Sequence, residues 1–515
     1  MAVAIAAAAQ HLVILHTNDI HSNIDPTAGV GGVLQRKALI DSVRKAEKNV
    51  MLVDAGDIVQ GPLYFKLYRG ELEYPLMDMM GYDIQILGNH EFDNGLEELA
   101  KYYKGSKTTK LSANYDFDGT PLEGVFKPYI IKKIDGKKVG FLGLNLNPDG
   151  IIAKENYKGM GYTDIIETGN EVADYLRNTE KCDVIVAVTH IGYDNDGVEG
   201  LTTDPELAEN TRNLDIIIGG HSHTLVDPAD PNGRPYRFKN LDGKDVIVVQ
   251  TGRYGAKLGK IDVDLSNPQA SVYSLIDIEG VDPTRFDKKM ERFIAPYKHV
   301  VDSINATPIA MVANDMMNKK KYTESITATN NISDIAQWYG TMVLDSLSRT
   351  DSRLPKRTDL AIMNSGGVRK PMPKGVVTEG DIYAAFPFPN NFWIMRFTGE
   401  QLADVLRQVA EKKNAGVSRE CIIAIDPETN EVTGISIGGQ AIDPERDYYV
   451  STIDYLGNGN DYLTNFKEGE VVWTDDKEMS HGVMRYVVEQ NALGIPLGLD
   501  TQSRIIEAQR VGTDD

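Results

Sequence analysis

The first half of the chain alternates short apolar runs with helical segments, and this alternation restricts the fold more than any other feature. Runs rich in β-branched residues, such as LVILHT (12–17) and CDVIVAVTH (182–190), are typical of buried strands, while GLEELAKYYK (95–104) has the pattern of a helix. The pair Asp135-Gly136 between two further β runs predicts a hairpin. Strands that alternate with helices pack as sheets covered by helices, so we expect an α/β fold with mixed sheets.

The length of 515 residues exceeds that of one ordinary domain. A second region of strands and helices follows a predicted helical connector. We therefore expect a first domain at residues 11–275, the connector at 276–324 and a second, α+β domain at 325–510.

The formal net charge of −21 excludes some partners. Such a surface repels nucleic acid and anionic membranes. It would also repel an anionic substrate, which then needs local positive charge from metal ions or a few arginines. No run of about 18 apolar residues follows the N-terminus, so we expect no transmembrane segment. The sequence does not indicate an oligomeric state.

The alanine-rich start, MAVAIAAAAQ, is similar to the last part of a secretory signal peptide. Residues 1–10 are therefore expected to be a signal-peptide remnant, and the mature protein to be exported to the periplasm or the cell surface. A frayed N-terminus is the alternative. Cys182 and Cys421 each adjoin an apolar β run, and we expect buried free thiols rather than a disulfide.

Polar residues follow the ends of five predicted strands in the first half. They are Asp19 and His21, Asp57, Asn89 with His90 and Asp93, His190, and His221 with His223. In open α/β sheets, ligands bind in the crevice outside the carboxyl ends of strands. A single Asp or His after a strand is usually a cap or a loop residue. Five such ends together predict one common site, because buried Asp and His side chains need partners.

The residue types at these five ends indicate a metal centre. Carboxylates, imidazoles and one amide, without a thiolate, suit Zn, Mn, Co or Fe better than a structural zinc site. Six or seven ligands are too many for one ion. They fit two divalent ions about 3.5–4 Å apart that share a carboxylate, which is the arrangement that clamps an in-line phosphoryl displacement.

Five motifs resemble those of calcineurin-like metallophosphoesterases, and their order resembles the 5′-nucleotidase family in particular. They are HTNDIHS (16–22), DAGDIVQG (54–61), GNHEFDNG (88–95), THIGYD (189–194) and GGHSHT (219–224). NSGGVR (364–369), AFPFPNNF (385–392) and YLGNGNDYL (455–463) resemble motifs of the family's C-terminal domain. The resemblance implies a layered α/β/β/α metallophosphoesterase domain, followed by a substrate-binding domain.

The resemblance also implies roles for single residues. Asp19, His21 and His223 would hold the first ion, Asn89, His190 and His221 the second, and Asp57 would bridge the two. His90, oriented by Asp93, would form the catalytic dyad. An imidazole held by a carboxylate can stabilise the phosphoryl group and protonate the leaving oxygen. The alternative for Asp93 is an N-cap of the helix at 95–104.

In the second domain, Phe388 and Tyr455 resemble the two aromatic residues that sandwich the base, although both could instead be core aromatics. Asp461 resembles the acceptor of the ribose hydroxyls. Asn364 and Arg369 resemble substrate contacts, and the guanidinium of Arg369 would pair with the phosphate.

One feature departs from the family. The segment YTESITATNNISDIAQW (322–338), which leads into a helix of the second domain, lacks the arginines that usually face the phosphate. The sequence thus predicts a two-metal phosphohydrolase that releases phosphate from nucleotides with a metal-activated water. A 2′,3′-cyclic-nucleotide phosphodiesterase or a nucleotide-sugar diphosphatase on the same scaffold is the alternative. A non-catalytic nucleotide-binding surface protein would not need His90.

Overall fold

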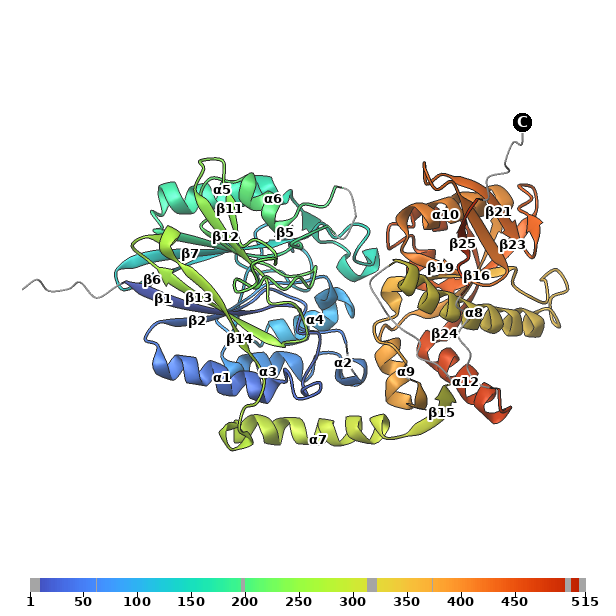
Figure 1. Cartoon of the computed structure of the whole chain (residues 1–515), viewed down its shortest axis with the longest axis horizontal. Helices are drawn as coiled ribbons and strands as arrows, with labels where there is room; N and C mark the ends of the chain where they lie inside the picture. Colours follow the sequence, from blue (N-terminus) through green and yellow to red (C-terminus); the bar gives the residue numbers. More distant parts are fainter. Residues whose placement is uncertain are drawn as a thin grey trace, which may run out of the picture. The chain divides into compact units, whose positions relative to one another are not determined.

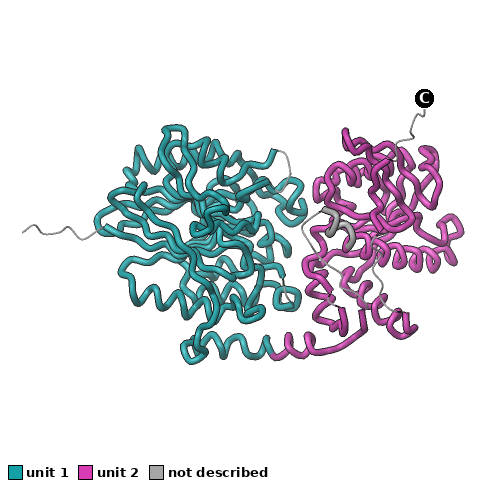
Figure 2. Tube along the Cα trace, in the orientation of Figure 1, with its two compact units in different colours: residues 1–298 teal, residues 299–515 magenta. Residues whose placement is uncertain are grey.

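The computed structural model describes residues 10–61, 63–195, 200–312, 322–372, 374–495 and 502–508, without the side chains of 322–327. The chain forms two compact units, Met1–Lys298 and His299–Asp515 (Figure 2). Except for Gln10, the predicted signal-peptide remnant at 1–10 lies outside the described residues. None of the described helices is long and apolar enough to cross a membrane.

Unit 1 is built on two six-stranded sheets. The first has the order β14-β13-β1-β2-β3-β4, with β1 to β4 parallel and β13 and β14 antiparallel at one edge. Its strands are β1 (His11–Thr17), β2 (Val50–Asp54), β3 (Ile84–Gln85), β4 (Thr109–Lys110), β13 (Lys257–Asp264) and β14 (Val272–Asp277). The second has the order β11-β12-β10-β9-β7-β6. Its strands are β6 (Tyr129–Ile134), β7 (Lys137–Asn145), β9 (Val184–His190), β10 (Ile216–Ile218), β11 (Arg237–Lys239) and β12 (Asp245–Val249).

Helices cover the outer faces of both sheets, which gives the expected α/β/β/α layering. In Figure 1, α1 and α3 lie against the sheet of β1 and β2, while α5 and α6 lie against the sheet of β7 and β12. The helices of unit 1 are α1 (Val33–Ala46), α2 (Leu63–Tyr68), α3 (Glu73–Met80), α4 (Gly95–Tyr103), α5 (Ile165–Asp174) and α6 (Asp204–Glu209). A short pair, β5 (Tyr115–Asp116) and β8 (Gly161–Tyr162), and helix α7 (Lys288–Asn305), which runs into unit 2, complete the set.

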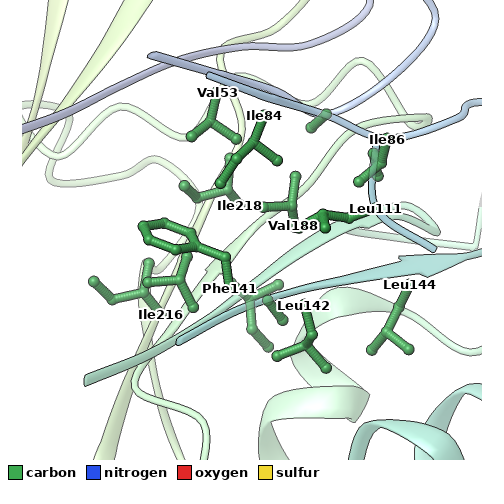
Figure 3. Packing of buried hydrophobic residues seen from close by; sticks show 14 of the residues in the cluster. Val53, Ile84, Ile86, Leu111, Phe141, Leu142, Leu144, Val188, Ile216 and Ile218 are labelled. Atoms are coloured by element: carbon green, nitrogen blue, oxygen red, sulfur yellow. The ribbon is translucent and has the colours of Figure 1, made fainter. Parts of the chain in front are cut away.

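The two sheets of unit 1 pack face to face through one apolar core. Figure 3 shows Val53 and Ile84 of the first sheet near Phe141, Val188 and Ile218 of the second. All seven residues of β9 are buried. Strands covered on both faces need continuous apolar runs, which explains why CDVIVAVTH does not alternate. The core holds the carboxyl ends of these strands, where the polar motifs begin, in fixed positions.

Unit 2 contains a five-stranded sheet of order β19-β16-β23-β18-β24, a four-stranded sheet of order β22-β21-β20-β25 and the pair β15-β17. The strands are β15 (Pro308–Val312), β16 (Leu360–Asn364), β17 (Gly375–Thr378), β18 (Asn391–Thr398), β19 (Ala415–Val417), β20 (Cys421–Ile425), β21 (Val432–Ile437), β22 (Gln440–Ala441), β23 (Asp447–Ile453), β24 (Glu470–Glu478) and β25 (Ile505–Glu507). The helices are α8 (Tyr322–Leu347), α9 (Glu379–Ala385), α10 (Gly399–Lys412), α11 (Asp454–Gly457) and α12 (Met479–Ala492). Helix α8 packs on β16, β19 and β23.

Several local predictions can be compared with the structure. The hairpin at Asp135-Gly136 is confirmed, and both residues have the positive φ of a type I′ turn, 48° and 84°. Cys182 and Cys421 are buried free thiols, as expected. Strand β3 is only two residues long, although the backbone N–H of the next residue, Ile86, still donates to Asp54 O of β2 at 3.2 Å.

Candidate metal centre

The loops that carry the predicted ligands have unusual backbone conformations. Five of these residues have positive φ: Asp19 (50°), His21 (49°), Asp57 (56°), His221 (82°) and His223 (56°). This region costs a non-glycine residue on the order of 1–3 kcal/mol, and such residues cluster at functional sites. Backbone hydrogen bonds hold the first two loops together, because His21 N donates to Asp57 O at 3.0 Å and Asp19 N to Gly56 O at 3.0 Å. The turns thus aim their side chains into one space.

Asp19, His21 and His223 form a first group of potential ligands. Nε2 of His21 lies 2.9 Å from Nε2 of His223. Asp19 Oδ1 lies 3.5 Å from His223 Nε2 and 3.8 Å from His21 Nε2. His21 Nδ1 contacts the carbonyl oxygen of Gln60 at 3.1 Å, which leaves Nε2 of that ring to face the group.

Asp57, His190 and His221 form a second group, and Asn89 lies beside it. His190 Nε2 is 3.3 Å from Asp57 Oδ2. His221 Nδ1 is 2.8 Å from Asn89 Oδ1. His190 Nδ1 contacts Ala55 O at 2.7 Å, and this contact with a carbonyl directs Nε2 to the ligand space.

Asp57 lies between the two groups. Its Oδ2 is 3.3 Å from His190 Nε2 and 3.8 Å from His21 Nε2. Asp57 thus lies within 4 Å of a histidine from each group. Burial would raise the pKa of this carboxyl, but His190, His90 and His21 lower it well below its usual range.

His90 and Asp93 stand next to this centre. His90 Nδ1 lies 3.0 Å from Asp93 Oδ2 and 3.2 Å from Oδ1. His90 also belongs to a third group of potential ligands, with His21 and Asp57. The N-cap of α4 is Asn94, so the alternative that made Asp93 the cap of this helix is wrong.

Glu91 is a supporting residue of the centre that was not predicted from the sequence. Its carboxylate accepts hydrogen bonds from three backbone N–H groups, those of Asp57 (3.0 Å), Ile58 (2.8 Å) and Gly88 (2.5 Å). A Cβ on Gly88 would come within 2.1 Å of Asp57 Oδ1, so this position requires glycine. The only signal in the sequence was an acidic residue inside the motif GNHEFDNG.

A second support, also not predicted, lies under the loop of His221 and His223. The buried carboxylate of Asp204 accepts from Thr189 Oγ1 at 2.6 Å and from Gln250 Nε2 at 3.0 Å. Gln250 Nε2 also donates to Gly220 O at 2.9 Å. Burial raises the pKa of Asp204 to about 7. This network ties the strand end at Thr189 to the turn that carries His221.

Two contacts link predicted substrate residues of unit 2 to one another. Asn364 Nδ2 donates to Asp461 Oδ2 at 3.0 Å, and burial raises the pKa of Asp461. The guanidinium carbon of Arg369 lies 5.8 Å from the ring centroid of Phe388. Tyr455 is partly buried against the core of unit 2. The base sandwich and the ribose contact stay predictions.

Comparison with known proteins gives two family matches. The model of the calcineurin-like phosphoesterases matches residues 12–225, and that of the 5′-nucleotidase C-terminal domain matches residues 303–468. The chain belongs to the 5′-nucleotidase family. Family membership makes the protein a metal-dependent hydrolase of phosphoric esters, within a family of nucleotide phosphohydrolases.

The relatives of this 5′-nucleotidase family member have moderate identity. It is 28% identical to the trifunctional nucleotide phosphoesterase protein YfkN of Bacillus subtilis, over 89% of this chain and 32% of that protein, about a third of its length. It is 29% identical to a 5′-nucleotidase of Vibrio parahaemolyticus, over 87% and 84% of the two chains. The solved structure of a 5′-nucleotidase precursor from Thermus thermophilus has a TM-score of 0.79 at 27% identity, covering 96% of this chain and 99% of that one.

The charges of the centre fit the divalent metal binding that the calcineurin-like fold implies. Burial raises the pKa of Asp19 to about 7. Burial also lowers the pKa of His190, but the Asp57 carboxylate outweighs this effect and raises that pKa to about 10. A proton on His190 therefore compensates the buried carboxylates when no cation is bound. A metal ion would take over that role and bind the same nitrogen.

Proposed function

We propose that the protein is a two-metal phosphohydrolase that releases phosphate from nucleotides. The observation that carries the proposal is the position of the Asp57 carboxylate within 4 Å of histidines from both ligand groups. Two divalent ions, when bound, would supply positive charge against the phosphoryl oxygens and a water-derived nucleophile at neutral pH. Asp19, His21 and His223 would hold one ion, Asn89, His190 and His221 the other, and Asp57 both. The carboxylate, imidazole and amide donors favour Zn, Mn, Co or Fe.

His90 is proposed to act on the leaving group. Its Nδ1 is fixed by Asp93 at 3.0 Å, so the carboxylate orients the ring and stabilises its charged form. The opposite nitrogen, Nε2, then delivers a proton or a hydrogen bond to the leaving oxygen. This role requires that His90 is not a metal ligand, although it lies near His21 and Asp57.

The second domain, about residues 325–510, is proposed to bind the nucleoside. Phe388 and Tyr455 would stack on the base, Asp461 would accept from the ribose, and Asn364 and Arg369 would contact the substrate. The match of the 5′-nucleotidase C-terminal domain to residues 303–468 supports this role. The catalytic domain would then be residues 11–275 and the connector 276–324. We also propose export, which the alanine-rich residues 2–9 support.

One observation favours a second candidate. The segment 322–338 contains no arginine, which weakens a standard monophosphate site. A cyclic nucleotide or a nucleotide sugar is therefore the second substrate class to test. One relative, YfkN, is named as a trifunctional nucleotide phosphoesterase, which supports a broad panel.

The test loads the protein separately with Zn, Mn, Co or Fe and measures, with malachite green, the phosphate that it releases from each substrate. The panel contains AMP, ADP, UDP-glucose and 2′,3′-cyclic AMP, the last two also followed by chromatography of the nucleotide product. Chelator-treated protein is the control and should be inactive. Binding of nucleotides without turnover of any panel member would contradict the proposal and favour a non-catalytic binder.

A further inference from the structure

An arginine of unit 1 lies against the first ligand group and has no role so far. Arg253 is exposed and follows β12 in the loop before β13. Its Nη1 lies 3.3 Å from Nδ1 of His223. Its guanidinium carbon lies 4.7 Å from the ring centroid of the next residue, Tyr254. No motif of the sequence analysis includes it.

The loop of Arg253 is fixed to the metal centre on both sides of this residue. Tyr254 N donates to Asp19 O at 2.7 Å. Asn18 Nδ2 donates to the carbonyl oxygen of Gly252 at 2.9 Å. The ring of Tyr254 also lies 5.9 Å from that of His21 and 6.3 Å from that of His223. The guanidinium therefore rests on an aromatic face that belongs to the wall of the site.

The contact between Arg253 and His223 does not suit the metal-loaded state. Nε2 of His223 is the nitrogen that faces His21 and Asp19, at 2.9 and 3.5 Å. When Nε2 binds a cation, the proton of the ring is on Nδ1. A guanidinium only donates hydrogen bonds. Two donors would then face each other, so Arg253 must turn to another acceptor while its stem and Tyr254 stay in place.

An anionic substrate offers that acceptor. The planar guanidinium matches the oxygens of a phosphate and can donate two parallel hydrogen bonds to them. The chain carries a net charge of −21, so a cation at the metal centre offsets repulsion where the substrate enters. The segment 322–338, which lacks arginine, leaves this role open.

We propose that Arg253 binds a phosphate oxygen of the substrate and supplies, from the catalytic domain, the guanidinium that segment 322–338 lacks. The proposal rests on the proposed function, because it assumes a phosphate at the metal centre. Arg253 is then a substrate-binding residue of the loop between β12 and β13. Its removal should weaken binding of phosphate groups and leave binding of uncharged ligands unchanged.

The experiment is calorimetric titration of metal-loaded protein with orthophosphate and, separately, with adenosine, which has no phosphate. Arg253→Ala should raise the Kd of orthophosphate roughly 10- to 100-fold, the span of a lost charge-assisted contact. The orthophosphate Kd of Arg253→Lys should lie between those of wild type and Arg253→Ala. Lysine keeps the positive charge but lacks the planar guanidinium with its paired N–H donors. The affinity for adenosine, the melting temperature and the metal content should not change.

Arg212→Ala is the matched control. It removes the same charge from an exposed arginine that pairs with Asp242 and precedes β10, at the opposite end of the strand from His221. It should bind orthophosphate as wild type does. Wild-type orthophosphate affinity in Arg253→Ala, or loss of metal from this variant, would overturn the proposal. If wild type binds orthophosphate but hydrolyses no panel member, the proposed function fails while the role of Arg253 is still measured.

Discussion

The backbone N–H of His90 donates a hydrogen bond to Oδ1 of Asp57 at 2.9 Å. The other oxygen of this carboxylate, Oδ2, lies 3.3 Å from His190 Nε2 and 3.8 Å from His21 Nε2. One side chain therefore contacts both ligand groups and the segment of the proposed catalytic dyad. Its charge and its hydrogen bond can be separated by substitution.

Asp57→Asn should remove one or both metal ions and abolish phosphate release. The amide oxygen still accepts from His90 N, but the negative charge that two cations share is lost. Elemental analysis of purified protein measures the metal directly. Glu98→Gln is the control and should keep its metal, because partly buried Glu98 pairs with exposed Lys101 and not with the ligand groups. Two full equivalents of metal in Asp57→Asn would show that Asp57 is not the bridge.

Glu91→Gln should destabilise the metal-free protein by about 1–3 kcal/mol, because part of a carboxylate that accepts three N–H groups becomes a donor. The amide nitrogen then faces a backbone N–H that has lost its acceptor. Urea unfolding measures the change, and the metal affinity of the same variant should fall because the turn of Asp57 loosens. Unchanged values of both quantities would show that another acceptor replaces the carboxylate.

Asp204→Asn should change how stability depends on pH. Burial raises the pKa of Asp204 in the folded state to about 7, above its unfolded value of 3.8. The folded protein thus binds more protons in this window, and the contribution of Asp204 to stability is present below pH 3.8 and lost as pH rises through 7. Asparagine does not titrate, so the variant should gain stability relative to wild type between pH 4 and pH 7.5. Urea midpoints of metal-free protein across this range test it, and parallel curves would contradict it.

Phe388→Ala and Tyr455→Ala should each remove about 1–3 kcal/mol of stacking on the base. The loss should appear in KM for nucleotides, while p-nitrophenyl phosphate, which has no base, should be hydrolysed almost as before. Phe386→Ala is the control, because Phe386 is 1% exposed and belongs to the core. It should lower the melting temperature instead. An equal loss for both substrates would identify Phe388 and Tyr455 as core residues.

The sequence allowed the five polar loops to be predicted because buried strands such as β9 have a strong apolar signal and end at chemically distinctive residues. The residues that support the ligand loops could not be predicted from the sequence, and the reason is physical. Glu91 acts through backbone N–H groups, and Asp204 acts through Gln250, which follows β12 and is distant in the sequence. Arg253 precedes a strand and resembles an ordinary surface arginine. Neither backbone hydrogen bonds nor the positive φ of Asp57 leave a pattern of residue types.

His90→Ala should separate chemistry from metal binding. If His90 acts on the leaving group, both ions stay bound and kcat falls by roughly 10²–10⁴, the span of a lost acid-base group. A good leaving group needs less help, so p-nitrophenyl phosphate should lose less rate than AMP. Asp93→Asn should weaken the same step, because the 3.0 Å contact to Nδ1 no longer stabilises the charged ring.

The double variant His90→Ala/Asp93→Asn decides whether the two residues act as one unit. Residues that act together are not additive, so the double variant should be little slower than His90→Ala alone. His90 also lies in a group with His21 and Asp57 that could hold an ion, so the alternative to test is that His90 is itself a metal ligand. Loss of one metal equivalent in His90→Ala, with equal losses for both leaving groups, would make His90 a ligand. The proton at the leaving oxygen would then have to come from another group.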